Sequence, residues 1–258
     1  ITAKTLTASY SASNKVYDGS ISATVVGSLN SVVSGDTVTL ANTSATFADK
    51  NVGTGKTVTI SGLSLGGADA TNYSLSNTSA TTTAAITAKS LTASYTASDK
   101  TYDGATSATV VGSLNSVVSG DTVTLANTSA TFADKNVGTG KTVTISGLSL
   151  GGTDAGNYTL SSTSTTTTAA ITAKSLTASY TASDKTYDGS RTATVSASSS
   201  DIVTGDAVTI SHSSATFADK NVGTGKTVSI SGISLSGTDA GNYSLASTSA
   251  SASAAISA

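Results

Sequence analysis

The chain repeats the same sequence every 85 residues. The first two copies differ at only 11 of these 85 positions, and no insertion separates one copy from the next. A strict period of this length is typical of an array of small domains and is unusual for a single large enzyme domain. Each copy is small but long enough to hold a core of its own. The predicted domains are residues 1–85, 86–170 and 171–255, with residues 256–258 as the start of a further repeat.

The composition is polar but weakly charged. Charged residues make up 11% of the chain, the net charge is −2, and Cys, Met, Trp and Pro are absent. No disulfide or thiolate metal site can form, and few side chains can be oxidised. We expect no nucleic-acid partner, because no basic stripe could neutralise phosphates. We also expect no membrane span in this segment, because no run of about 18 apolar residues occurs.

Apolar and polar residues alternate with a period of two, which is the pattern of half-buried strands. We therefore expect an all-β chain in which each copy is a small antiparallel β-sandwich of the immunoglobulin-like (Ig-like) type. A compact β-grasp-like unit with a helical turn at Ser28–Val33 is the alternative. The predicted strands of the first copy lie at residues 6–10, 38–40, 45–47, 58–60, 63–65 and 73–75. The predicted core consists of Leu6, Tyr10, Tyr17, Val25, Val38, Leu40, Phe47, Val58, Ile60, Leu63, Tyr73 and Leu75.

The segments that join the copies contain no Gly and no Pro. Residues 81–95 read TTTAAITAKSLTASY, which favours a strand throughout, and residues 166–180 are equivalent. We expect the last strand of one domain to run straight into the first strand of the next, which makes a stiff joint. The prediction is a rod in which the partners of each repeat are the neighbouring repeats of the same chain. Its length would be on the order of 100–130 Å.

Two recurring motifs have the residue types of ligand sites. Gly53–Thr57 ends like a phosphate-binding loop but lacks the earlier Gly, and a strand pattern follows it where a helix would be needed, so we expect a β-turn. Lys15–Gly19 pairs an aromatic ring with a carboxylate. We expect an Asp-Gly turn there, with the Tyr ring at the edge of the core, its hydroxyl hydrogen-bonded, and the Lys offsetting the Asp charge.

No set of residues predicts a metal or catalytic site. Asp36, Asp49 and Asp69 could meet at a domain joint and bind Ca²⁺, but their spacing is not that of a calcium loop, so we expect solvated turn acids. His212 is the only histidine and occurs in one copy alone, which leaves no nucleophile and base for catalysis in the array. We expect no enzyme activity and no cofactor.

Four motifs in a fixed order resemble the YDG-type repeat domains of large bacterial surface adhesins, the filamentous-haemagglutinin-like exoproteins. In the second copy they are Lys100–Gly104, Ser119–Leu125, Phe132–Val143 and Asp154–Tyr158, and the match covers essentially all three copies. One departure is Thr71, which replaces a Gly of the last motif in the first copy. The resemblance implies a stalk module with no catalytic residues, at the bacterial cell surface.

The resulting expectation is a structural stalk segment that holds a distal adhesive region away from the cell. Because the chain lacks Met and starts inside a repeat series, we expect it to be part of a longer protein. One alternative is a self-associating subunit of an extracellular fibre or biofilm matrix, whose partners are other copies of the same protein. The other is a multivalent module that binds glycans weakly through its repeated copies. For the stalk, host or matrix glycans would be partners of regions outside this segment.

Overall fold

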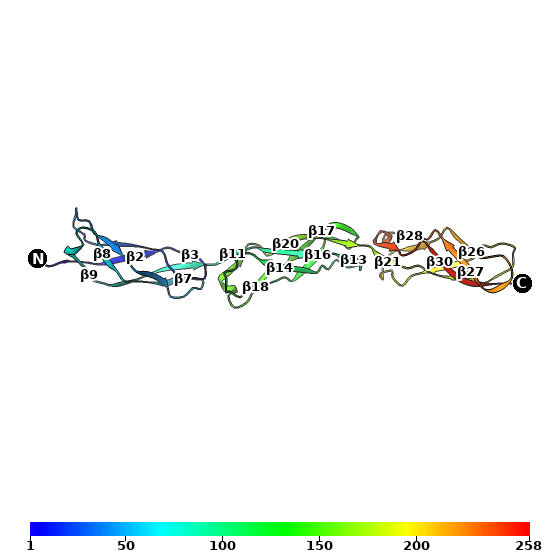
Figure 1. The fold of residues 1–258 in the computed structure, drawn as a ribbon, viewed down its shortest axis with the longest axis horizontal. Coiled ribbons are helices and arrows are strands. Elements are labelled where there is room, and N and C mark those ends of the chain that lie inside the picture. Colours follow the sequence, from blue (N-terminus) through cyan, green and yellow to red (C-terminus); the bar gives the residue numbers. More distant parts are fainter. The chain divides into compact units, whose positions relative to one another are not determined.

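The computed structural model describes all of residues 1–258. They form short strands joined by turns, and the only helical element of each repeat is one 3₁₀ turn (Figure 1). No helix is long and apolar enough to cross a membrane. The strands of the first repeat are β1 (Lys4–Leu6), β2 (Ala8–Ala12), β3 (Lys15–Val16), β4 (Val25–Leu29), β5 (Thr39–Ala41), β6 (Ser44–Phe47), β7 (Gly53–Ser61), β8 (Ser64–Gly66), β9 (Tyr73–Leu75) and β10 (Ser79–Thr87), with the turn η1 at Ala70–Asn72.

The second and third repeats reproduce these elements in the same order. Those of the second are β11 (Lys89–Leu91), β12 (Ala93–Ala97), β13 (Lys100–Thr101), β14 (Val110–Leu114), β15 (Thr124–Ala126), β16 (Ser129–Phe132), β17 (Gly138–Ser146), β18 (Ser149–Gly151), η2 (Ala155–Asn157), β19 (Tyr158–Leu160) and β20 (Ser164–Thr172). Those of the third are β21 (Lys174–Leu176), β22 (Ser179–Ala182), β23 (Lys185–Thr186), β24 (Val195–Ser198), β25 (Thr209–Ser211), β26 (Ser214–Phe217), β27 (Gly223–Ser231), β28 (Ser234–Ser236), η3 (Ala240–Asn242), β29 (Tyr243–Leu245) and β30 (Ser249–Ser257).

A four-stranded sheet is the largest element of each repeat. In the first repeat its order is β3-β10-β7-β6, in which β10 pairs with β7 antiparallel and with β3 parallel. Along β7, Val58 and Ile60 point into the core, whereas Thr57 and Thr59 face solvent. The alternation of apolar and hydroxyl residues therefore decides which face of the sheet is buried. Three two-stranded ribbons complete the repeat, β1 with β9, β2 with β4 and β5 with β8.

The prediction of an all-β chain in three repeated units is confirmed. Strands occupy all six predicted positions, although Thr7 interrupts the first of them. Two strands were not predicted: β3, which is only two residues long, and β4, because Val25–Leu29 contains a Gly. The helical turn of the β-grasp alternative at Ser28–Val33 is wrong, because β4 runs through Leu29 and the helical turn lies at Ala70–Asn72 instead.

The predicted core is only partly correct. Leu6, Tyr17, Phe47, Val58, Ile60, Leu63 and Tyr73 are buried, whereas Tyr10, Val25, Val38, Leu40 and Leu75 are only half-buried. Ile86 was not among the predicted core residues, yet it is fully buried and pairs with Lys15 and Gly53 of the first repeat. Ile86 and Thr87 thus complete the sheet of the repeat that precedes them in sequence, and Ile256 does the same for the third repeat.

Gly53-Thr54-Gly55 is not the predicted β-turn but the first part of β7. Ile86 pairs with Gly53 and Ala84 with Lys56, so two residues of β7 lie opposite one residue of β10. Gly55 has a φ of 61°, a conformation that Gly adopts without the steric cost of a side chain. This β-bulge turns the Lys56 side chain toward Asp49, where Nζ lies 2.7 Å from Oδ1.

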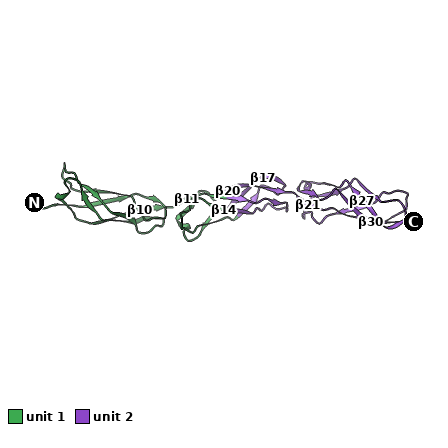
Figure 2. Cartoon of the chain, in the orientation of Figure 1, with its two compact units in different colours: residues 1–94, 112–128, 147–164 green, residues 95–111, 129–146, 165–258 purple.

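The strand that was predicted to cross the joint between repeats is interrupted twice. Ala88 and Thr92 separate β10, β11 and β12, so three strands follow one another where a single strand was expected. The compact units of the chain also do not coincide with the sequence repeats. One unit consists of residues 1–94, 112–128 and 147–164, and the other of residues 95–111, 129–146 and 165–258 (Figure 2). Each junction between two repeats therefore lies inside one compact unit.

Replacing Phe132 by Ala tests the core of the second repeat. Phe132 is buried at the end of β16, beside Val143 of β17. We expect the substitution to lower the free energy of unfolding by about 3–5 kcal/mol, because it leaves a cavity. Urea unfolding followed by circular dichroism measures this loss. Val111→Ala is the control, because Val111 is exposed in the same repeat; a loss of less than about 1 kcal/mol for Phe132→Ala would contradict the assignment.

Candidate functional site

Within the first compact unit, the carboxylate of Asp121 connects two neighbouring repeats. Its Oδ2 accepts hydrogen bonds from the hydroxyls of Tyr17 (2.8 Å) and Tyr158 (2.6 Å), and its Oδ1 accepts one from Nζ of Lys50 (3.0 Å). Two of these three donors belong to the first repeat, although Asp121 belongs to the second. The Asp121 side chain is only 2% exposed. The candidate site is therefore the junction between neighbouring repeats.

The second repeat holds Asp121 in place by itself. Gly120 has a φ of 92°, and the turn closes with a hydrogen bond from the Asp121 amide to the carbonyl of Val118 (3.1 Å). The Tyr158 hydroxyl donates to the Asp121 carboxylate and accepts from the amide of Val118 (3.0 Å). These contacts fix the carboxylate before any neighbour docks. We call the surface formed by Val118, Asp121, Asn157 and Tyr158, and its equivalents in the other repeats, the aspartate face.

The first repeat holds Tyr17 in a similarly fixed turn. Lys15 donates from Nζ to Asp18 Oδ1 (2.7 Å) and to the carbonyls of Ser20 (2.8 Å) and Ser22 (3.1 Å). The amide of Tyr17 donates to the carbonyl of Thr87 in β10 (2.8 Å). The Asp-Gly turn and the Lys–Asp pairing predicted for this motif are confirmed. The hydroxyl of Tyr17 is hydrogen-bonded as expected, but its partner lies in the next repeat.

A second loop of the first repeat carries Lys50 and two residues that hydrogen-bond to the side-chain amide of Asn157. Asp49 accepts from the amide of Asn51 (2.8 Å) and from Lys56 (2.7 Å), which shapes the loop around Lys50. Beyond it, the amide of Val52 donates to Asn157 Oδ1 (2.9 Å), and Asn157 Nδ2 donates to Asn51 Oδ1 (3.3 Å). Tyr17, Gly19, Lys50, Asn51 and Val52, with their equivalents, form what we call the tyrosine face.

Ring packing covers the polar contacts of the junction. The rings of Tyr17 and Tyr158 meet edge to face, with centroids 5.4 Å apart, and Lys50 Nζ lies 5.9 Å from the Tyr17 centroid. Aromatic pairs in this geometry add to the stabilisation from buried area. Gly19, with a φ of 80°, allows the turn to approach Val118, since a Cβ on Gly19 would lie 2.8 Å from Val118 Cγ1.

The junction between the second and third repeats has the same contacts, all inside the second compact unit. Asp206 accepts from Tyr102 (2.7 Å), Tyr243 (2.7 Å) and Lys135 (2.8 Å). Asn242 Oδ1 accepts a hydrogen bond from the amide of Val137 (2.9 Å), and Asn242 Nδ2 donates one to Asn136 Oδ1 (3.2 Å). The tyrosine rings of the pair Tyr102 and Tyr243 lie 5.5 Å apart. The contacts are thus a property of the repeat and not of one pair of copies.

The charges at the first junction shift each other's pKa. The Tyr158 hydroxyl, then Lys50 and Tyr17, stabilise the ionised Asp121 and lower its pKa despite the opposing effect of burial. Burial, together with the hydrogen bond to Asp121, raises the pKa of Tyr158 to about 12. The hydrogen bond to Asp121 raises the pKa of Lys50. At neutral pH the junction therefore holds a carboxylate, an ammonium group and two neutral phenols.

The acids that could have met around a calcium ion do not form such a cluster. Asp121 and Asp154, the equivalents of Asp36 and Asp69, lie near one another, but Lys50 Nζ lies between them at 3.0 Å and 3.9 Å. The ammonium group takes the place of a bridging cation. No group of three or more His, Cys, Asp or Glu side chains is arranged to hold a metal ion. His212 packs edge to face on Tyr180, with centroids 5.6 Å apart.

The motifs of the junction were predicted from the sequence, but the contacts between them were not. Lys15–Gly19, the turn before Asp36 and the Asn-Tyr pair of the last motif were each assigned to a role inside one repeat. Asn51 was not singled out. The signal available in the sequence was that every copy carries both the donors, Tyr17 and Lys50, and the acceptor, Asp36, interleaved along the repeat.

The YDG domain family matches the chain three times, at residues 2–84, 87–168 and 172–250. The chain therefore belongs to this family, as a tandem array of three YDG domains. No curated protein matches the chain. The recognition of YDG-type repeats in the sequence is confirmed, while their link to bacterial adhesins stays a prediction.

Replacing Asp121 by Asn should weaken the first junction. Asn keeps an oxygen for the Tyr158 hydroxyl but loses the charge that pairs with Lys50. Asp36→Asn is the matched control, because Asp36 accepts from Tyr73 in the same way (2.6 Å) but makes no contact with another of the three repeats. We expect Asp121→Asn to lower the free energy of unfolding by about 1–3 kcal/mol more than the control does. Equal losses in urea unfolding would show that the cross-repeat contacts contribute nothing.

The stabilisation from Asp121 should disappear in acid. Because its pKa is lower in the folded chain than in the unfolded one, its contribution is complete above the unfolded value of about 3.9 and is lost as the pH falls through the folded value. We expect the difference in free energy of unfolding between the wild type and Asp121→Asn to be constant near neutral pH and to shrink below about pH 4. A difference that persists unchanged to pH 2 would contradict this.

Proposed function

We propose that the chain is a structural spacer segment of a bacterial extracellular adhesin, in which it holds a distal adhesive region away from the cell. The observation that carries the proposal is the junction, where side chains that each repeat fixes for itself meet in a buried set of contacts. A domain array joined in this way resists bending, whereas an array on flexible linkers does not. Resistance to bending is what a spacer requires.

The energetics of the junction favour a single relative orientation of two repeats. Burying a carboxylate without partners is costly, so the junction is stable only when Tyr17 and Lys50 both reach Asp121. Asn157 adds two directional hydrogen bonds on the adjacent loop. Three separate points of contact, with tyrosine rings between them, leave little freedom for rotation or tilt.

The chemistry of the chain suits an exposed location. It has no Cys or Met to oxidise, and every repeat carries its own buried core and β-sheet. We propose the Ig-like sandwich as the layering of each repeat, and secretion to the cell surface as its location. A spacer needs no catalytic centre, and we propose that the chain has none.

Small-angle X-ray scattering at the lowest measurable concentration tests this proposal. We expect a maximum dimension on the order of 100–130 Å for the wild type. Tyr17→Ala combined with Tyr102→Ala removes one donor from each junction and should shorten the average particle. Tyr187→Ala is the matched control, because the same residue of the third repeat is exposed and its loss should leave the dimension unchanged. A compact wild-type particle would overturn the proposal.

A further inference from the structure

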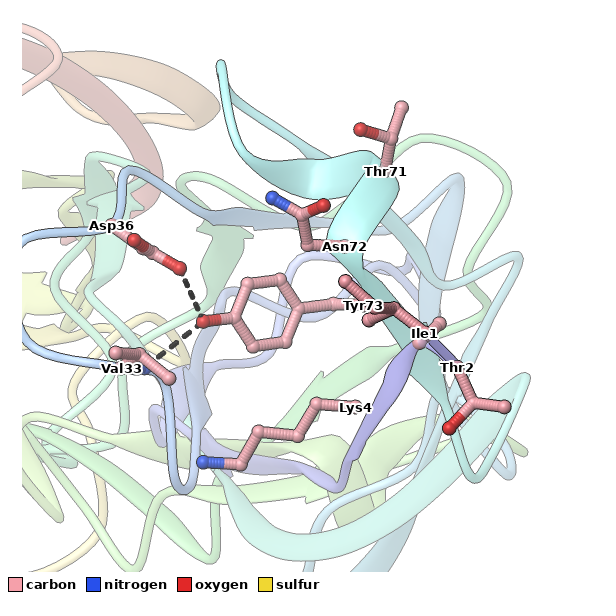
Figure 3. Close-up of a pocket in the computed structure, with 9 residues that line it drawn as sticks. Ile1, Thr2, Lys4, Val33, Asp36, Thr71, Asn72 and Tyr73 are labelled. Atoms are coloured by element: carbon pink, nitrogen blue, oxygen red, sulfur yellow. Dashed lines mark hydrogen bonds between the residues drawn. The ribbon is translucent and has the colours of Figure 1, made fainter.

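Strands from the start of each repeat pair with strands from its end, and the paired strands run in the same direction. In the first repeat, β1 pairs parallel with β9 along the whole of both strands. Figure 3 shows the beginning of this pair, where Lys4 lies beside Tyr73. Farther along the chain, β3 pairs parallel with β10, with Lys15 beside Ile86. The start of the repeat is therefore attached to its end at two separate places.

Further hydrogen bonds lengthen the first attachment beyond the strands themselves. The amide of Ser76 donates to the carbonyl of Leu6 (2.8 Å), and the hydroxyls of Thr7 and Ser76 lie 3.0 Å apart. The amide of Ala8 donates to Asn77 Oδ1 (3.2 Å). The contact between the two segments thus continues through residues 4–8 and 73–77.

The second attachment is reinforced in the same way. The amide of Tyr17 donates to the carbonyl of Thr87 (2.8 Å), and Thr87 Oγ1 donates to the carbonyl of Lys15 (3.2 Å). Ala85 lies at the β-bulge of β10, and its amide donates to Asn14 Oδ1 (2.7 Å). The side chain of Asn14 therefore connects the start of the repeat to its last strand.

Both attachments recur in the other repeats, and each lies within one compact unit. β11 pairs parallel with β19 and β13 with β20, while β21 pairs parallel with β29 and β23 with β30. Asp99 accepts from the amide of Ala170 (2.6 Å), and Asp184 accepts from the amide of Ala255 (2.6 Å). An Asp thus does in these repeats what Asn14 does in the first.

The direction of the pairing decides how a repeat responds when its ends are pulled apart. Tension draws β1 and β3 backwards and β9 and β10 forwards, so parallel partners must slide along one another. The hydrogen bonds across each pair then carry the load together, whereas an antiparallel hairpin pulled at its two ends opens one residue pair at a time. Only Ala88 separates β10 from β11, so tension passes directly from one repeat to the next.

We infer that these parallel pairs give the chain a further function, which is to bear tension along its length. We call the pairs β1–β9 and β3–β10, with their equivalents, the tension clamp. The inference goes beyond the proposed spacer, because a rod can resist bending and still come apart when its ends are pulled. It also rests on contacts inside each repeat and not on the junction between repeats.

Single-molecule force spectroscopy tests the inference. The chain has no Cys, so Thr2→Cys and Ala258→Cys supply the only two attachment points, and both positions are exposed. We expect distinct force peaks, each releasing at least one repeat. One repeat adds on the order of 250 Å, the length of 85 extended residues less that of the folded repeat. A chain that extends without force peaks would overturn the inference.

A second pair of attachment points changes only the direction of pulling. Thr2→Cys and Thr71→Cys each lie two residues before their strand, at the same end of the β1–β9 pair, and both positions are exposed (Figure 3). Pulling there opens the pair one residue pair at a time. We expect the opening force to be lower by about twofold or more than every peak of the end-to-end experiment, because fewer hydrogen bonds share the load. Equal forces would contradict a clamp.

A pair of matched variants separates the clamp from general stability. Asp99→Ala removes the acceptor for Ala170 and should lower the force of one peak in the end-to-end experiment. Asp134→Ala is the control, because this exposed acid of the same repeat accepts from the amide of Asn136 (2.8 Å) in the loop between β16 and β17, outside the clamp. Its peaks should stay unchanged even where urea unfolding shows a loss of stability, since forced unfolding reports the unfolding barrier.

The outcomes keep the clamp and the spacer apart. Equal effects of Asp99→Ala and Asp134→Ala on the force peaks would overturn the inference, as would the absence of any effect of Asp99→Ala. Neither result depends on the maximum dimension from scattering, which tests the spacer separately. A chain that is long in solution but gives no force peaks would keep the spacer and remove the clamp.

Discussion

The buried carboxylate at each junction is the interaction on which the arrangement of neighbouring repeats depends. A carboxylate that loses contact with water is tolerated only when it is paired and hydrogen-bonded. Asp121 obtains one donor from its own repeat, Tyr158, and two from the preceding one, Tyr17 and Lys50. Its desolvation and its pairing therefore occur in the same docking step. A neighbour that is tilted or rotated would bury the carboxylate without satisfying it, which selects one geometry.

This dependence explains why the compact units do not follow the sequence period. The core of the first repeat continues through Tyr17 and Tyr158 into the near half of the second repeat, so the densest packing crosses the junction. Ile86 belongs by sequence to the second copy but fills the core of the first. The array thus gains stability from its interfaces as well as from its repeats, as nearest-neighbour coupling requires.

Rules that use only neighbouring residues, such as apolar alternation and turn-forming residue types, predict the strands and turns of this fold. The period-two alternation around Val58 and Ile60 places a strand and its buried face, and Asp18-Gly19 places a turn. The same rules take β10, β11 and β12 for one strand, because Ala88 and Thr92, where the chain breaks, have no turn-forming residue type. They also predict a turn at the Gly-rich start of β7, because a β-bulge uses the same residue type as a turn. The role of Asp121 at the junction is also not predicted by local rules, because its partners Tyr17 and Lys50 lie 104 and 71 residues away in the sequence.

The repeated faces also place a constraint on the chain that a single domain would not have. Because every repeat carries one tyrosine face and one aspartate face, each junction pairs the donors of one repeat with the acceptor of the next. The connection between repeats favours this pairing, because β10, β11 and β12 follow one another with single-residue breaks. A connection this short gives the two faces of a junction a high effective concentration within one chain. The specificity of the stacking therefore comes from the paired side chains, and its strength comes in part from the short connection between them.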